Sequence, residues 1–124
     1  MISLYNVCVV GAGRWGKNHI CTLSELGALG GFVESNDEIL NSLKSNYPEI
    51  QYFSDLGSAL PHEFDDFSVA TPAETHFDIA RKIIESGHHI LVEKPITMTS
   101  ADAICLHELS IKHKVNLMVG HVLL

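Results

Sequence analysis

The chain alternates between short apolar runs and longer segments in which apolar residues recur every three or four positions. Strand-like segments occur at Val7–Val10, Leu29–Val33, Gln51–Phe53, Phe67–Ala70, His89–Val92 and Val115–Val119. Strands that are buried on both faces of a parallel sheet are typically continuous apolar runs, as Val7–Val10 and Leu117–Val119 are. The pattern therefore predicts about six strands in a parallel sheet.

The segments between these strands have helical periodicity. Helices are predicted at Trp15–Leu26, 36–47, Ser54–Leu60, 72–86 and Ser100–Lys114. The first of these helices has its apolar residues on or near one face: Trp15, Ile20, Leu23 and Leu26. Strands that alternate with helices along the whole chain predict a single doubly wound α/β domain of the Rossmann type.

A glycine-rich loop follows the first strand, with the spacing G-x-G-x-x-G at Gly11, Gly13 and Gly16. Gly11 would allow a tight turn, Gly13 would let a pyrophosphate approach the backbone, and Gly16 would let the helix pack close to the strand. The free N–H groups and positive dipole end of that helix would face the phosphates. The loop predicts a dinucleotide site, and the alternative is a turn without a ligand. All six loop residues are candidate cofactor contacts: Gly11, Ala12, Gly13, Arg14, Trp15 and Gly16.

An acidic residue about 20 positions after such glycines, at the end of the second strand, is the second sign of a dinucleotide site. Glu34 stands there, directly after Gly31-Phe32-Val33. Its carboxylate could accept hydrogen bonds from the adenosine ribose hydroxyls and would repel a 2′-phosphate, and no Arg or Lys follows before Lys44. Glu34 therefore favours NAD over NADP, and the alternative is a solvated loop acid.

Ligands of open α/β sheets bind at the carboxyl ends of the strands, which directs attention to three further segments. Thr71-Pro72 follows the fourth strand and could line the nicotinamide half of a cofactor or simply begin a helix. Glu93-Lys94-Pro95 follows the fifth strand, where desolvation could make Lys94 a proton donor to a substrate oxygen, oriented by Glu93. The alternative for Glu93 and Lys94 is a surface ion pair of little energetic value. Gly120-His121 ends the sixth strand.

Composition excludes several classes of partner. Of the 124 residues, 46% are hydrophobic and 19% are charged, which is typical of one globular domain. A net charge of −7 without a basic cluster argues against nucleic acid or an anionic membrane as partner. No apolar run approaches the ~18 residues that a membrane span needs.

The cysteines and histidines carry no signature of their own. Cys8, Cys21 and Cys105 are far apart and odd in number, so we expect reduced, buried thiols in a cytoplasmic protein. His88-His89 resembles a metal pair only in composition, because no acidic partner stands at a ligand spacing. We expect His76 to pack locally, and no Ser-His-Asp or Cys-His signature is found. The other histidines that we assign to the surface or to helix faces are His19, His62, His107 and His113.

Four segments together resemble the N-terminal domain of the glucose–fructose oxidoreductase/inositol dehydrogenase (Gfo/Idh/MocA) family. They are Gly11–Gly16, Ala70–His76, Gly87–Pro95 and Val119–His121, in the family's order and spacing across the whole chain. Glu-Lys-Pro after the fifth strand is the most specific of them. The family often has a lysine where this chain has His88, a change that we expect to be neutral.

The resemblance implies a role for each matched position. Lys94 would contact the nicotinamide ribose and the substrate and assist catalysis, with Glu93 and Pro95 beside it. Thr71 and Pro72 would line the cofactor site, and His121 would lie near the nicotinamide. The implied reaction is hydride transfer between NAD and a hydroxyl-bearing carbon of a sugar, polyol or nucleotide-sugar. The Gly-His-Val-Leu-Leu ending most resembles members that act on nucleotide-linked sugars.

The family's enzymes have a second α+β domain that supplies most of the substrate pocket and the sheet used in oligomers. We therefore expect this chain to be the cofactor half of a homo-oligomeric dehydrogenase, with little activity by itself. An apolar patch at Val122, Leu123 and Leu124 should promote self-association. The alternative is a non-catalytic nucleotide-sensing or interaction module of the same fold.

Overall fold

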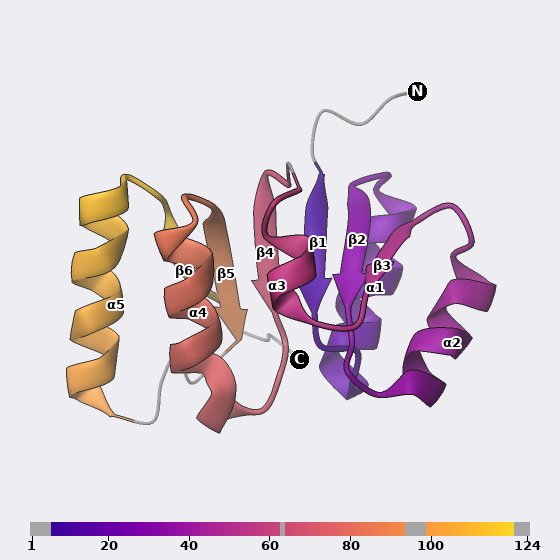
Figure 1. Ribbon diagram of the computed structural model, residues 1–124, viewed down its shortest axis with the longest axis horizontal. Coiled ribbons are helices and arrows are strands. Elements are labelled where there is room, and N and C mark those ends of the chain that lie inside the picture. Colours follow the sequence, from indigo (N-terminus) through magenta and orange to yellow (C-terminus); the bar gives the residue numbers. More distant parts are fainter. Residues whose placement is uncertain (1–5, 63, 94–98, 121–124) are drawn as a thin grey trace.

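The computed structural model describes residues 6–62, 64–93 and 99–120, and within them six parallel strands form one sheet. The strands are β1 (Val7–Val10), β2 (Leu29–Val33), β3 (Gln51–Phe53), β4 (Asp66–Val69), β5 (His89–Glu93) and β6 (Leu117–Gly120). Their order in the sheet is β3-β2-β1-β4-β5-β6. The arrows of β1, β2, β4 and β5 in Figure 1 point to the lower edge of the sheet, and because all the paired strands are parallel, their carboxyl ends share that edge. The predicted doubly wound α/β domain is confirmed.

The order of the strands reverses at β1. The chain moves outward from β1 through β2 to β3, returns to β4 on the other side of β1, and then moves outward again to β6. Loops that leave β1 and β4 in opposite directions create a crevice at the carboxyl edge, which is where ligands of such sheets bind.

Helices cover both faces of the sheet (Figure 1). They are α1 (Arg14–Glu25), α2 (Asp37–Asn46), α3 (Leu56–Ala59), the 3-10 turn η1 (Ala73–Thr75), α4 (His76–Glu85) and α5 (Ser100–His113). Asn36 and Asp55 cap α2 and α3 by accepting hydrogen bonds from the N–H groups of Ile39 and Ser58. No helix in the described ranges is long and apolar enough to cross a bilayer.

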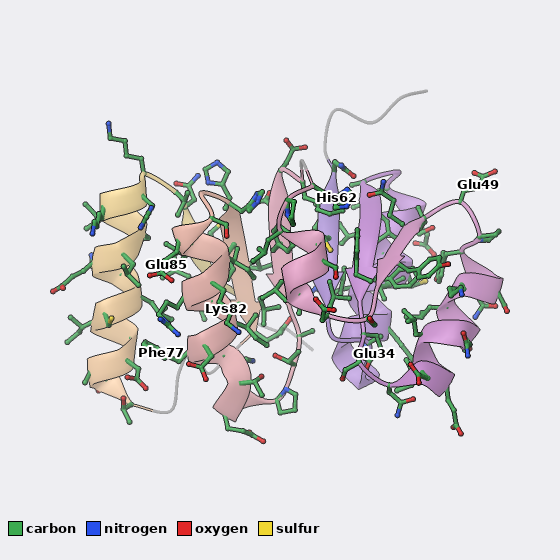
Figure 2. All side chains as sticks on the ribbon, in the orientation of Figure 1. Glu34, Glu49, His62, Phe77, Lys82 and Glu85 are labelled. Atoms are coloured by element: carbon green, nitrogen blue, oxygen red, sulfur yellow. The ribbon has the colours of Figure 1, made fainter. Side chains whose placement is uncertain are left out.

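Each face of the sheet has its own apolar cluster, because successive strand residues point to opposite faces. Val9 and Phe32 pack with Ile20 of α1 and with α2 on one face. On the other face, the neighbours of those strand residues, Val10 and Val33, belong to the cluster that includes α3, α4 and α5. Figure 2 shows Phe77 of α4 on the side that faces α5.

The prediction that the cysteines are buried is wrong for two of the three. Cys21 and Cys105 are exposed on the outer sides of α1 and α5, and only Cys8 is buried, in the centre of β1. Burial raises the pKa of the Cys8 thiol well above its ordinary value, so Cys8 stays protonated and unreactive.

The His88 ring lies between two backbone carbonyl groups. Its Nε2 lies 3.0 Å from the carbonyl oxygen of Leu60, and its Nδ1 lies 3.2 Å from that of Phe64. Carbonyl oxygens only accept hydrogen bonds, so the ring nitrogen that carries the proton donates to one of them. The neighbouring His89 instead accepts a hydrogen bond from the Asn116 N–H at Nδ1 (2.9 Å), so the two rings serve different backbone groups.

The burial of the thiols predicts a graded reaction with a thiol reagent. In the native chain, a disulfide-exchange reagent should modify Cys21 and Cys105 quickly and leave Cys8 unmodified, because only Cys8 is shielded from solvent. In denaturant all three cysteines should react. Counting the released chromophore before and after unfolding measures this, and rapid modification of Cys8 in the native chain would contradict the assigned core.

Candidate functional site

The three glycines of the β1–α1 loop meet three different steric demands. Gly11 has a φ of +92°, which favours glycine, and a Cβ there would lie 2.7 Å from the Thr71 Cγ2. A Cβ at Gly16 would overlap the Gly11 carbonyl oxygen, so α1 packs directly on the backbone of the loop. A Cβ at Gly13 would meet no described atom within 4 Å, and the residue is exposed. The loop is therefore tight at its two ends and open in the middle.

The N terminus of α1 borders the open space at Gly13, and no described side chain caps it. Gly13 is the N-cap residue, and the first turn of the helix contains no acidic residue. The first N–H groups of a helix have no partners within the helix and carry partial positive charge. Next to an open Gly13, these groups can bind a phosphate.

Glu34 reaches from the end of β2 back to the glycine loop. Its Oε1 accepts a hydrogen bond from the Ala12 N–H (2.7 Å), and its Oε2 accepts one from the Asn36 N–H (2.8 Å). Figure 2 places Glu34 at the lower edge of the sheet, where the strands end. Each carboxylate oxygen keeps a second lone pair, so Glu34 can also accept hydrogen bonds from ligand hydroxyls.

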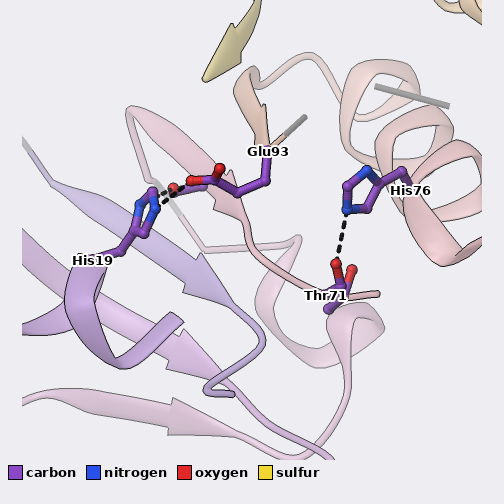
Figure 3. Close-up of polar contacts among 5 residues, drawn as sticks. His19, Thr71, His76 and Glu93 are labelled. Atoms are coloured by element: carbon purple, nitrogen blue, oxygen red, sulfur yellow. Dashed lines mark hydrogen bonds and ion pairs between the residues drawn. The ribbon is translucent and has the colours of Figure 1, made fainter. Parts of the chain in front are cut away.

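Thr71 and Pro72 lie on the other side of the glycine loop, after β4. The Thr71 carbonyl accepts a hydrogen bond from Nε2 of His76, which is 1% exposed (2.8 Å; Figure 3). The Thr75 hydroxyl is hydrogen-bonded to the Thr71 hydroxyl (2.7 Å) and to the Pro72 carbonyl (2.6 Å). These bonds hold the β4–α4 loop in one conformation, and His76 packs locally as predicted.

Glu93, the last residue of β5, turns toward α1. Figure 3 shows its carboxylate pointing to His19, whose Nε2 lies 2.5 Å from the Glu93 Oε1. The other ring nitrogen of His19, Nδ1, lies 3.1 Å from the hydroxyl of Ser68 on β4. His19 is a helix-face residue, as predicted, but the sequence did not predict that its ring would join two strands. The role of Glu93 in orienting Lys94 stays a prediction, because Lys94 lies outside the described residues.

The contacts among Ser68, His19 and Glu93 follow the order of a catalytic Ser-His-acid triad. These residues are nevertheless not placed for nucleophilic catalysis. Ser68 is 3% exposed and lies within β4, where no substrate carbonyl can reach its hydroxyl. A nucleophilic serine must be accessible and must lie beside donors that stabilise an oxyanion. We therefore interpret the three residues as a structural connection at the sheet edge.

The helical spacing of the sequence could have shown that His19 faces the sheet. It lies three positions after Gly16 and one before Ile20, both of which are buried against the loop or the sheet. A polar residue at that spacing faces the sheet and needs a buried partner. The identity of the partners could not be inferred, because Ser68 and Glu93 are distant in sequence.

Three of the predicted site residues, Lys94, Pro95 and His121, lie outside the described residues, as does the predicted apolar patch at 122–124. For Arg14 and Trp15 the structure describes the backbone within α1 but not the side chains. The remaining predicted residues gather along the carboxyl edge. They lie on both sides of the glycine loop: Glu34 on the β2 side, and Thr71, Pro72 and Glu93 on the β4–β5 side.

Comparison with known proteins identifies a protein family and several relatives of this chain. The model of an oxidoreductase family, for its NAD-binding Rossmann fold, matches residues 5–121. UDP-N-acetylglucosamine 3-dehydrogenase of Acidithiobacillus ferrooxidans is 28% identical over 119 residues, which are 92% of this chain and 36% of that protein. Inositol 2-dehydrogenase of Corynebacterium glutamicum is 30% identical over 119 residues, which are 92% of this chain and 35% of that protein.

Solved structures with bound NADH or NAD have a similar fold. The WlbA dehydrogenase from Bordetella pertussis, in complex with NADH and UDP-GlcNAcA, has a TM-score of 0.87 at 27% identity, over 93% of this chain and 36% of that one. GenD2 from gentamicin A biosynthesis, in complex with NAD, has a TM-score of 0.88 at 28% identity, over 97% of this chain and 35% of that one. The chain thus spans about a third of the length of the relatives that it matches.

The glycine geometry predicts different effects of the same substitution at two positions. Gly16→Ala should lower the free energy of unfolding by about 2 kcal/mol, because the new methyl group overlaps the Gly11 carbonyl and α1 must move. Gly13→Ala is the matched control and should cost less than about 1 kcal/mol, the loss of a glycine N-cap. Denaturant unfolding followed by circular dichroism measures both values, and equal losses would contradict the assigned packing.

Proposed function

The chain belongs to the Gfo/Idh/MocA family of oxidoreductases, as its NAD-binding Rossmann domain, and we propose that its carboxyl edge holds NAD for hydride exchange with a sugar or nucleotide-sugar. The observation that carries this proposal is the joint geometry of Gly13 and Glu34. The open space at Gly13 adjoins the N terminus of α1, and the Glu34 carboxylate borders the same loop through the Ala12 N–H. A phosphate site and an acceptor for ribose hydroxyls are thus neighbours.

The cofactor would lie across the switch point between β1 and β4. The pyrophosphate would occupy the space at Gly13, with the adenosine ribose at Glu34 on the β2 side. The nicotinamide half would then extend over the ends of β4 and β5, beside Thr71 and Glu93. The bonds among Thr71, Thr75 and His76 support this placement, because they keep the β4–α4 loop rigid.

NAD fits this edge better than NADP. A 2′-phosphate on the adenosine ribose would meet the Glu34 carboxylate and would need a cation to neutralise it. Lys44 is the next basic residue along the chain, and its Nζ lies 4.3 Å from the centre of the Tyr52 ring, within the range of a cation–π contact. In the described part of this edge, the Glu34 carboxylate would therefore repel the extra phosphate, and Lys44 is held at Tyr52 and does not neutralise it.

The proposed reaction divides its tasks between residues of this chain and the cofactor. When bound, NAD would supply the acceptor for a hydride from the carbon that carries the substrate hydroxyl. Lys94, which follows Glu93 in the matched Glu-Lys-Pro sequence, would polarise that hydroxyl and help to remove its proton. The chain spans about a third of the length of these relatives. We propose that a second domain holds the substrate and mediates a homo-oligomer, and that the protein acts in the cytoplasm.

Cofactor titrations of the 124-residue chain test the proposal. NADH should bind with nicotinamide fluorescence enhancement, and NADPH should bind at least about tenfold more weakly because of its repulsion by Glu34. Gly13→Ala should weaken NADH binding about tenfold, because the methyl group fills the space left for the pyrophosphate.

Unfolding measurements on the same Gly13→Ala sample serve as the control, since the proposal requires a loss of binding without a comparable loss of stability. Two results would refute it. One is the absence of NADH binding at millimolar concentration, and the other is equal affinity for NADH and NADPH.

A further inference from the structure

His19 connects the helix that begins at the glycine loop with the ends of two strands on the far side of that loop. Its Nε2 bonds to Glu93 at the end of β5 (2.5 Å), and its Nδ1 bonds to Ser68 on β4 (3.1 Å). Figure 3 shows the His19 ring reaching from α1 to Glu93 across the edge of the sheet. The side chains of His19 and Glu93 are 21% and 11% exposed, so the contact is largely shielded from water.

The donors and acceptors of this connection match. A carboxylate only accepts hydrogen bonds, so the proton of the contact with Glu93 is carried by Nε2 of His19. The Ser68 hydroxyl can either donate to Nδ1 or accept from it, so both contacts are compatible with a neutral and with a protonated ring. Among the described residues His19 supplies the hydrogen bond to Glu93, and its loss would leave a buried carboxylate unsatisfied.

The same helix is fixed at a second point, one turn earlier. Gly16 packs against the Gly11 carbonyl, and His19 lies three positions further along α1. A regular helix keeps these two contacts at a fixed separation. The phosphate-binding loop and the ends of β4 and β5 are therefore tied to one rigid element.

We infer that His19 is a positioning residue, which sets the ends of β4 and β5 relative to the glycine loop so that both halves of the dinucleotide are held at once. This inference rests on the proposed function, because it concerns the same cofactor. The adenosine half contacts the loop and Glu34 and needs no help from His19. The nicotinamide half lies over β4 and β5 and depends on it.

Three variants separate the two contacts of His19. His19→Gln places an amide donor near the position of Nε2 and can keep the bond to Glu93. His19→Asn places its amide near the position of Nδ1 and can keep only the contact with Ser68. His107→Asn makes the same chemical change on the exposed surface of α5 and is the matched control.

The experiment measures NADH and ADP affinities of the folded 124-residue chain and of each variant. For His19→Asn, the Kd of NADH should rise about tenfold, the enhancement of nicotinamide fluorescence should fall, and the Kd of ADP should change less than about twofold. His19→Gln should recover most of the NADH affinity, and His107→Asn should leave both ligands unaffected. A merely structural role for His19 would weaken NADH and ADP to the same extent.

Several results would overturn the inference. Unchanged NADH affinity in folded His19→Asn would do so, as would equal losses for NADH and ADP. If His19→Asn does not fold, Ser68→Ala decides in its place: it removes the contact of His19 with β4 alone, so the Kd of NADH should rise about threefold while the Kd of ADP changes less than about twofold, and an unchanged Kd of NADH would overturn the inference. A wild-type chain that binds neither NADH nor ADP would refute the proposed function itself, which is distinguishable from binding that is insensitive to His19.

Discussion

The close approach of α1 to the backbone of the glycine loop determines the rest of the site. The absence of a side chain at Gly16 lets the helix rest against the Gly11 carbonyl, and Gly11 in turn packs on Thr71. At this distance Ile20 is fully buried against the sheet, and His19 reaches Ser68 and Glu93. The loop, the helix and the ends of three strands thus form one close-packed unit, in which a single added methyl group would require the helix to move.

The carboxyl edge is divided into two halves by this unit. On the β2 side, Glu34 links the end of its strand to the loop through the Ala12 N–H, and it also holds the Asn36 N–H at the start of α2. On the β4–β5 side, His76 and His19 hold Thr71 and Glu93. Both halves use buried or partly buried side chains to fix backbone at the edge. Such preorganisation lowers the cost of ordering the protein when an extended ligand binds.

Local sequence patterns predicted the fold and pointed to the carboxyl edge of the sheet as the candidate site. Apolar runs and helical periodicity identified the strands and helices, because burial on two faces and on one face leave different patterns. The spacing of Gly11, Gly13 and Gly16, and the position of Glu34, identified the edge because backbone conformation and strand ends are local properties. What the sequence did not predict depends on contacts between distant segments. His19 meets Ser68 and Glu93 only after the sheet has formed, and Cys21 and Cys105 are exposed because of how α1 and α5 are rotated about their axes.

Two-dimensional ¹H–¹⁵N NMR spectra of the chain during an NADH titration test the central claim most directly, since each backbone amide reports its own surroundings. If the carboxyl edge holds the cofactor, the amide shifts will concentrate at Gly11–Gly16, Glu34, Thr71 and Glu93. Amides at the opposite edge of the sheet, such as those of Asn6 and His89, will stay unchanged. Shifts concentrated at the opposite edge, or saturating NADH that moves no amide of the glycine loop, would contradict the account.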